Sequence, residues 1–163
     1  MRTSHTFLLV VALLMPAACR AQANCPWINE ATARGILGGP VTAAVKITES
    51  GPQVCEFTQQ QGTTLRELSI WVNAMTDIPK QFSRYLSQCS PKSTPLRAIG
   101  NEAVTCSVQT HGNLYAERVV GRVREQAFVV SVGSSLQNDP SLTPEVRREK
   151  AKLVAEMVAG ILF

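Results

Sequence analysis

The chain has 163 residues, of which 45% are hydrophobic and 17% are charged, and its formal net charge is +4 at neutral pH. This length suits one domain with a sizeable core, and the composition excludes a collagen-like, a low-complexity disordered or a multi-spanning membrane protein. The modest charge gives no reason to expect a nucleic acid partner, and we predict none.

The N-terminus has the pattern of a secretory signal peptide. An unbroken apolar run over residues 7–15 follows a short polar start. The run is too short to cross a bilayer, which needs about 20 residues, but it suits the apolar part of a signal peptide. Ala21-Gln22-Ala23 has the small-residue spacing of a signal-peptidase site. We therefore predict a signal peptide over 1–23 and one exported domain over 24–163, in the periplasm or outside the cell.

Cys19 provides an alternative to simple secretion. It follows Pro16-Ala17-Ala18, which is similar to the lipobox of bacterial lipoproteins, although proline stands where that box usually has leucine. In this alternative Cys19 is lipidated and anchors the protein in a membrane. Under both interpretations the only contact with a membrane is through the signal peptide or this lipid.

The first half of the predicted domain reads as a helix followed by three strands. Asn29 caps a helix that extends to residue 37, and Gly38-Gly39-Pro40 ends it, because glycine accepts the left-handed conformation and proline cannot continue a helix. Alternating apolar residues then predict three strands, separated by turns, over 41–48, 53–59 and 65–74.

The second half repeats this order. Asp77 caps a helix with Pro79 in its first turn, and a loop is expected over 90–95. Three strands are predicted over 103–110, 114–123 and 127–133, and Thr143 then caps a closing helix. We expect its apolar stripe to pack on the sheet and its basic side to face solvent, with a membrane-surface or partner-binding helix as the alternative. The stripe comprises Val146, Leu153, Val154, Met157, Val158 and Ile161, and the basic residues are Arg147, Arg148, Lys150 and Lys152.

The order of the elements predicts the fold class. Hairpins dominate, and no strand–helix–strand unit requires parallel strands. We therefore predict an α+β domain with an antiparallel sheet of about six strands, on which a short N-terminal helix, a middle helix and a C-terminal helix pack.

Four cysteines follow the predicted cleavage site, and an even number in an exported domain indicates disulfides. Three pairings are possible, and we favour Cys25–Cys55 with Cys89–Cys106, because each pair joins a helix end to a nearby strand. The sequence has no C-x-x-C pair, and His111 is the one histidine beyond the cleavage site. We therefore predict no metal site and no cofactor.

Few residues suggest catalysis. His111 lies in a His-Gly-Asn turn, where simple exposure explains it, and a hydrolase triad would need it as the base. Glu56 and Glu67 lie on strands that can be neighbours, so they form a candidate carboxylate pair. Trp27 and Trp71 are candidates for a binding surface, although partial burial explains them as well.

Several short motifs give the chain a family resemblance. Cys25-Pro26-Trp27, a short helix, Leu37-Gly38-Gly39-Pro40-Val41 and Cys55-Glu56-Phe57 resemble small exported bacterial domains of unknown function, many of them lipoproteins. The segment 99–103 and the closing helix are similar to theirs, although Asn101 replaces their usual acidic residue. The resemblance implies a location in the cell envelope and no catalytic residues.

These observations favour a non-enzymatic envelope protein that binds a protein, lipid or peptide. The alternatives are an inhibitor of an extracellular or periplasmic enzyme and a hydrolase that uses carboxylates. A cleft with perturbed carboxylates would favour the hydrolase, and a protruding loop would favour the inhibitor.

Overall fold

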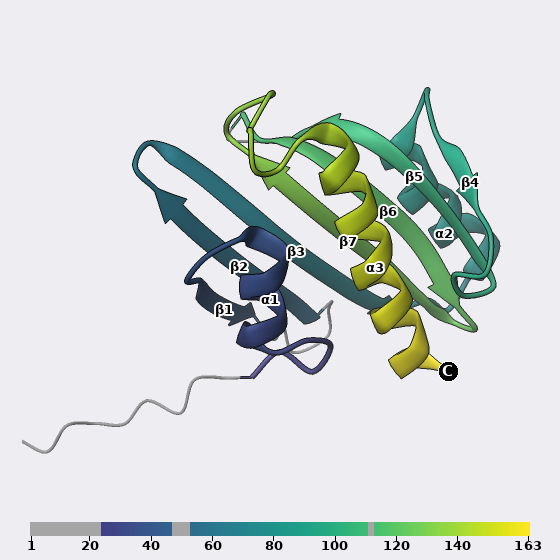
Figure 1. The fold of residues 1–163 in the computed structure, drawn as a ribbon. Helices are drawn as coiled ribbons and strands as arrows, with labels where there is room; N and C mark the ends of the chain where they lie inside the picture. Colours follow the sequence, from purple (N-terminus) through teal and green to yellow (C-terminus); the bar gives the residue numbers. More distant parts are fainter. Residues whose placement is uncertain (1–23, 47–52, 111–112) are drawn as a thin grey trace, which may run out of the picture.

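The computed structural model describes residues 24–46, 53–110 and 113–163. The predicted signal peptide with its cleavage site, Cys19 and His111 lie outside the described residues. Seven strands form one open antiparallel sheet in the order β1-β2-β3-β7-β6-β5-β4 (Figure 1). The strands are β1 (Thr42–Lys46), β2 (Gln53–Gln61), β3 (Thr64–Ala74), β4 (Thr94–Leu96), β5 (Glu102–Gln109), β6 (Tyr115–Val123) and β7 (Gln126–Ser134).

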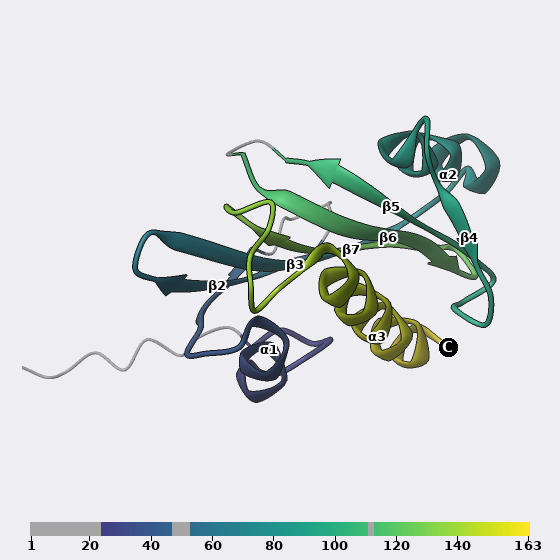
Figure 2. The ribbon, with the colours of Figure 1, turned by 45° about the horizontal axis from the view of Figure 1, so that its top comes forward.

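Three α-helices lie on the two faces of this sheet. Figure 2 shows α1 and α3 on one face and α2 on the other. They are α1 (Glu30–Leu37), α2 (Ile78–Leu86), which continues into the 3₁₀ helix η1 (Ser87–Cys89), and α3 (Pro144–Leu162). The structure therefore confirms the predicted α+β fold with an antiparallel sheet and a C-terminal helix packed on it.

The structure has one strand more than the six predicted. This strand, β4, begins within the loop predicted over 90–95. It has only three residues and includes Pro95, so it shows no alternation of apolar residues. It pairs with β5 alone, at the edge of the sheet, where proline is tolerated because its missing N–H faces away from the partner strand.

The helix ends follow the local rules that the sequence suggested. The side chains of Asn29, Asp77 and Thr143 each accept a hydrogen bond from a backbone N–H in the first turn of the following helix. Gly38 ends α1 in the left-handed conformation, with a φ of 83°.

The main core lies between the sheet and the helices α1 and α3. Phe57 and Phe128 are among its largest fully buried side chains. From α3, Val154 and Val158 reach this core together with three alanines: Ala151, Ala155 and Ala159. The small alanine side chains allow α3 to lie close to β6 and β7.

Two predictions about α3 are wrong in detail. Four of the six residues of the predicted apolar stripe point away from the sheet, because the alanines on the neighbouring side of the helix make the contact instead. The exposed residues are Val146, Leu153, Met157 and Ile161. Arg147, which we expected to face solvent, is buried.

A second, smaller core lies under α2 on the opposite face. Phe82 of α2 packs there with Met75, Val120 and Val129. This helix covers only the side of the face formed by β5, β6 and β7. Over the side formed by β1, β2 and β3, none of the described residues forms a helix (Figure 2).

Both predicted disulfides are present. Cys25–Cys55 joins the segment before α1 to β2, and Cys89–Cys106 joins η1 to β5, with Cα–Cα distances of 5.7 and 5.4 Å. Each bridge therefore ties a helical segment to the face of the sheet that it covers. Two disulfides are compatible with an oxidising, exported environment.

A buried ion pair that the sequence did not suggest joins the sheet to the loop before α3. Arg66 Nε and Nη2 donate to the two carboxylate oxygens of Asp139 at 2.6 and 2.8 Å, and Ser134 also donates to this carboxylate. The bonds from Arg66 are the largest reason that the pKa of Asp139 is lowered to about 2. Arg66 also donates to the carbonyl of Leu37, so one guanidinium connects β3, the loop and the end of α1.

Candidate functional site

The open half of the sheet face bears a hollow of about 440 Å³, which we call the open-face hollow. A volume of this order is typical of small-molecule pockets. Its lining comes from β2, β3, β6 and β7, and from Gln88 and Thr110 at its rim. The helix α2 does not extend over β2 and β3 (Figure 2), so the hollow is reached from solvent beside that helix.

A line of polar residues crosses four neighbouring strands at the floor of the open-face hollow. Glu56 on β2 pairs in register with Ser69 on β3, which pairs with Ser131 on β7, which pairs with Arg118 on β6. Directly paired residues of an antiparallel sheet share a face. The line therefore has a carboxylate at one end, a guanidinium at the other and two small hydroxyl side chains between them.

The acidic end contains a second carboxylate. Glu67 lies on β3, two residues before Ser69, and therefore on the same face as Glu56. Partial burial raises the pKa of Glu67, and repulsion from the Glu56 carboxylate raises it further. Lys46 forms an ion pair with Glu56 at 3.1 Å, so one of the two negative charges has a partner.

At the basic end of the line, the positive charge of Arg118 has no negative partner among the described residues. Arg118 is half-buried, and its Nε donates to Ser131 Oγ at 2.9 Å while Nη1 donates to Gln88 Oε1 at 3.3 Å. Within the part of the chain that the structure describes, no carboxylate forms an ion pair with it. Its burial lowers the pKa of this guanidinium, which still remains charged at any ordinary pH.

An exposed aromatic side chain stands beside this line. Trp71 follows Ser69 by two residues on the same face, and 38% of its surface remains exposed, which is high for a tryptophan. Its register partners on that face are Val54 and Val129. These three side chains form an apolar wall next to the charged floor.

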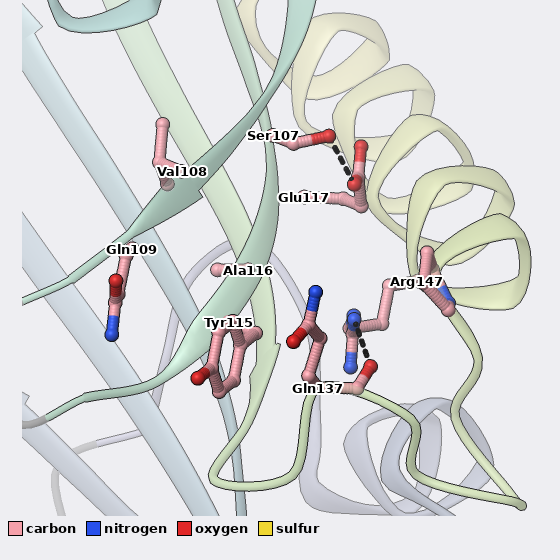
Figure 3. A pocket seen from close by; sticks show the side chains of 9 residues that line it. Ser107, Val108, Gln109, Tyr115, Ala116, Glu117, Gln137 and Arg147 are labelled. Atoms are coloured by element: carbon pink, nitrogen blue, oxygen red, sulfur yellow. Dashed lines mark hydrogen bonds between the residues drawn. The ribbon is translucent and has the colours of Figure 1, made fainter.

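A second cavity, of about 300 Å³, lies on the other face between β5, β6 and the start of α3 (Figure 3). Glu117 is buried there, and it accepts hydrogen bonds from Ser107 Oγ and from Arg148 Nε. The carboxylate therefore already has a positive partner from α3, unlike Glu67.

Arg147 also lines this cavity, where its hydrogen bonds stabilise the fold. Its guanidinium donates to the carbonyls of Leu136, Gln137 and Leu142, so it holds the loop that leads into α3. Figure 3 shows the bond to Gln137. Its Nε is buried and has no hydrogen-bond partner among the described residues. The charged groups of this cavity are used to stabilise the fold, so we regard the open-face hollow as the stronger candidate.

The structure places the residues that the sequence suggested as follows. Glu56, Glu67 and Trp71 come together at the open-face hollow. Trp27 packs against the main core on the other face, so it does not join them. The sequence did not single out Arg118, because a lone arginine in a predicted strand is ordinarily a solvent-facing residue.

Other features of the described residues add no further site. They contain no group of three or more His, Cys, Asp or Glu side chains that could hold a metal ion. None of the helices in the described ranges is long and apolar enough to span a membrane.

Comparison with known proteins assigns no family to this fold and site. No protein-family model matches the chain, and no curated protein sequence matches it.

Proposed function

We propose that the protein is an exported, non-enzymatic binding domain of the bacterial cell envelope, and that its ligand occupies the open-face hollow. The observation that supports this proposal most is the separation of unmatched charges in one hollow. Among the described residues, Arg118 forms no ion pair with a carboxylate, and Glu67 forms none with a cation, although the Lys46 ammonium, which is paired with Glu56, partly offsets the rise in the pKa of Glu67. Charged groups that lose water without gaining a partner cost folding free energy, and a ligand that supplies the partners recovers it.

The exposed Trp71 supports the same location. Tryptophan is a frequent anchor at binding sites, because its large apolar ring buries much surface while few bonds lose their rotation. A binding role also agrees with the two disulfides, which brace both faces of the sheet and so hold the strands of the hollow in place.

Ligand capture tests the proposal. The full chain is expressed in bacteria, recovered from the envelope fraction and exposed to a protein-free envelope extract, and the retained small molecules are identified by mass spectrometry. We expect the parent to retain a molecule that Trp71→Ala and Arg118→Gln do not retain. Leu153→Ser, on the exposed side of α3, is the matched control and should retain it. If the hollow variants retain the same molecules as the parent, the ligand does not bind at this site.

The raised pKa of Glu67 favours one second candidate, a hydrolase in which a carboxylic acid donates a proton. The same experiment separates the two functions. A binding protein returns its ligand chemically unchanged after long incubation. A hydrolase converts it, and Glu67→Gln would then bind the ligand without converting it.

A further inference from the structure

We propose that the open-face hollow binds a short peptide with free termini, two or three residues long, a proposal that rests on the binding function proposed above. Its ammonium group lies at the end of the hollow formed by Glu56 and Glu67. Its carboxylate lies at the Arg118 end, and its backbone crosses the floor between them.

Together with Lys46, which pairs with Glu56 from the neighbouring strand β1, the charged residues that line the hollow have formal charges that sum to zero but are separated in space. Glu56 and Glu67 are negative, whereas Lys46 and Arg118 are positive, and Lys46 is paired with Glu56 at the acidic end. One negative charge therefore remains at the β2–β3 end and one positive charge at the β6 end. A ligand that matches this pattern is neutral overall and has a cation and an anion at its two ends, so it is a zwitterion.

The acidic end suits an ammonium group. Three hydrogens of an ammonium can reach both carboxylates, and its charge removes the repulsion that raises the pKa of Glu67. Trp71 lies on the same face of β3, four residues beyond Glu67, and its partner on β2 is Val54, two residues before Glu56. It therefore offers an apolar surface next to the line of polar residues.

The basic end suits a carboxylate. Two nitrogens of Arg118 donate to Ser131 and Gln88, which fix the direction of the guanidinium. Its remaining N–H groups have no carboxylate partner among the described residues. A charge-assisted bond from a fixed, partly desolvated guanidinium is stronger than one formed in water.

The spacing of the strands sets the length of the ligand. Glu56 and Arg118 are three strand spacings apart, which is about 14 Å between their backbones. Arg118 shortens this gap, because its Nε bonds to Ser131 on the intervening strand β7. An extended peptide of two or three residues spans roughly 7–11 Å, which fits the remainder, whereas a single amino acid is too short. Ser69 and Ser131 lie under the middle, where their hydroxyl groups can bond to the peptide backbone.

Fluorescence titration with blocked and unblocked peptides tests this inference. The chain has two tryptophans, so Trp27→Phe leaves Trp71 as the only reporter. The full chain with this substitution is recovered from the envelope fraction and titrated with Ala-Leu-Ala, with its N-acetyl form and with its C-terminal amide. We expect the unblocked peptide to bind at least tenfold more tightly than either blocked form.

Variants then assign each terminus to its end of the hollow. Arg118→Gln should remove the preference for the free carboxylate and keep the preference for the free amine, and Glu67→Gln should do the reverse. Arg84→Gln, an exposed arginine on α2, is the matched control and should keep both preferences. The comparison of blocked with unblocked peptides on the parent needs no variant, so a misfolded variant does not prevent the test.

Two results would overturn the inference. One is equal affinity for the blocked and unblocked peptides, and the other is the absence of any Trp71 response up to millimolar peptide. Either result can occur while Trp71→Ala and Arg118→Gln still fail to retain the molecule that the parent captures from envelope extract. In that case the binding function stands and only the proposed identity of the ligand is wrong. If the hollow variants capture the same molecules as the parent, both proposals fail.

Discussion

Glu67 and Asp139 show how surroundings alone give two carboxylates opposite properties. Asp139 is fully buried but receives two bonds from Arg66, and its pKa falls to about 2. The pKa of Glu67 rises instead, because partial burial is not offset by an ion pair of its own and the Glu56 carboxylate lies nearby. The first arrangement stabilises the fold, whereas the second weakens it. A destabilising arrangement on a solvent-facing surface is typical of a functional site.

We predict that Glu67→Gln makes the protein more stable at pH 7. When folding raises the pKa of a carboxyl group, the folded protein becomes less stable as the pH rises and the group ionises. Glutamine does not ionise, so it removes that cost. The gain should vanish below the ordinary pKa of 4.5, where the parent side chain is protonated in both states. Urea unfolding at pH 7 and pH 4 measures this. Glu149→Gln, on exposed α3 surface, should change stability by under about 0.5 kcal/mol at either pH.

We predict that Arg66→Met costs about 3–5 kcal/mol at pH 7, because it leaves the Asp139 carboxylate buried without its partner. The lowered pKa of Asp139 stabilises the parent above the ordinary value of 3.8, by roughly 2 kcal/mol, and this contribution is lost as the pH falls toward about 2. The difference between parent and variant should therefore shrink in acid. Arg34→Met removes a comparable ion pair on the surface and should cost under about 1 kcal/mol. A similar loss in both variants would contradict this account of the buried pair.

Local signals in the sequence were enough to predict where the helices end and where most of the strands lie. Asn29, Asp77 and Thr143 act as caps where predicted. The strand β4 was missed because its three residues depend on β5 for their conformation and show no pattern of their own. The contact side of α3 was partly misjudged because a stripe of alanines carries little hydropathy signal, although small residues allow the closest packing.

Gly121 on β6 is an element-scale constraint that the sequence did not indicate. A Cβ at this position would lie 2.3 Å from Cζ of Phe128, so the Phe128 ring covers the bare backbone. We predict that Gly121→Ala costs about 1–3 kcal/mol, because the buried ring has little room to move. Gly160→Ala on α3 is the control: a Cβ there meets no atom within 4 Å, and alanine should add about 0.5–1 kcal/mol. Thermal unfolding of the two variants should show opposite shifts in Tm.

At the scale of the whole molecule, the two faces of the sheet have different roles. One face is covered by α1 and α3 and contains the main core, whereas the other is covered by α2 only in part (Figure 2). The sequence predicted the sheet and its disulfides, since alternation and cysteine spacing are local. The sequence suggested Glu56 and Glu67 as a pair but did not suggest Arg118. The strand order β3-β7-β6 brings Arg118 to the same face through long-range strand pairing, which local sequence patterns do not specify.

Export gives a prediction for the whole chain. We expect protein from the envelope fraction to begin at Asn24, because Ala21 and Ala23 fit the signal-peptidase site and Pro16 departs from the lipobox. Intact mass spectrometry checks this. A mass that corresponds to a chain beginning at a diacylglyceryl Cys19 would instead establish the lipoprotein alternative.

An amide chemical-shift map shows whether the open-face hollow is the functional site. Isotope-labelled protein is titrated with the protein-free envelope extract, and the shifted amides are located on the structure. We expect them to cluster on β2, β3, β7 and β6, around Ser69, Ser131 and Arg118. Shifts confined to the exposed side of α3, or to the cavity of Figure 3, would contradict it.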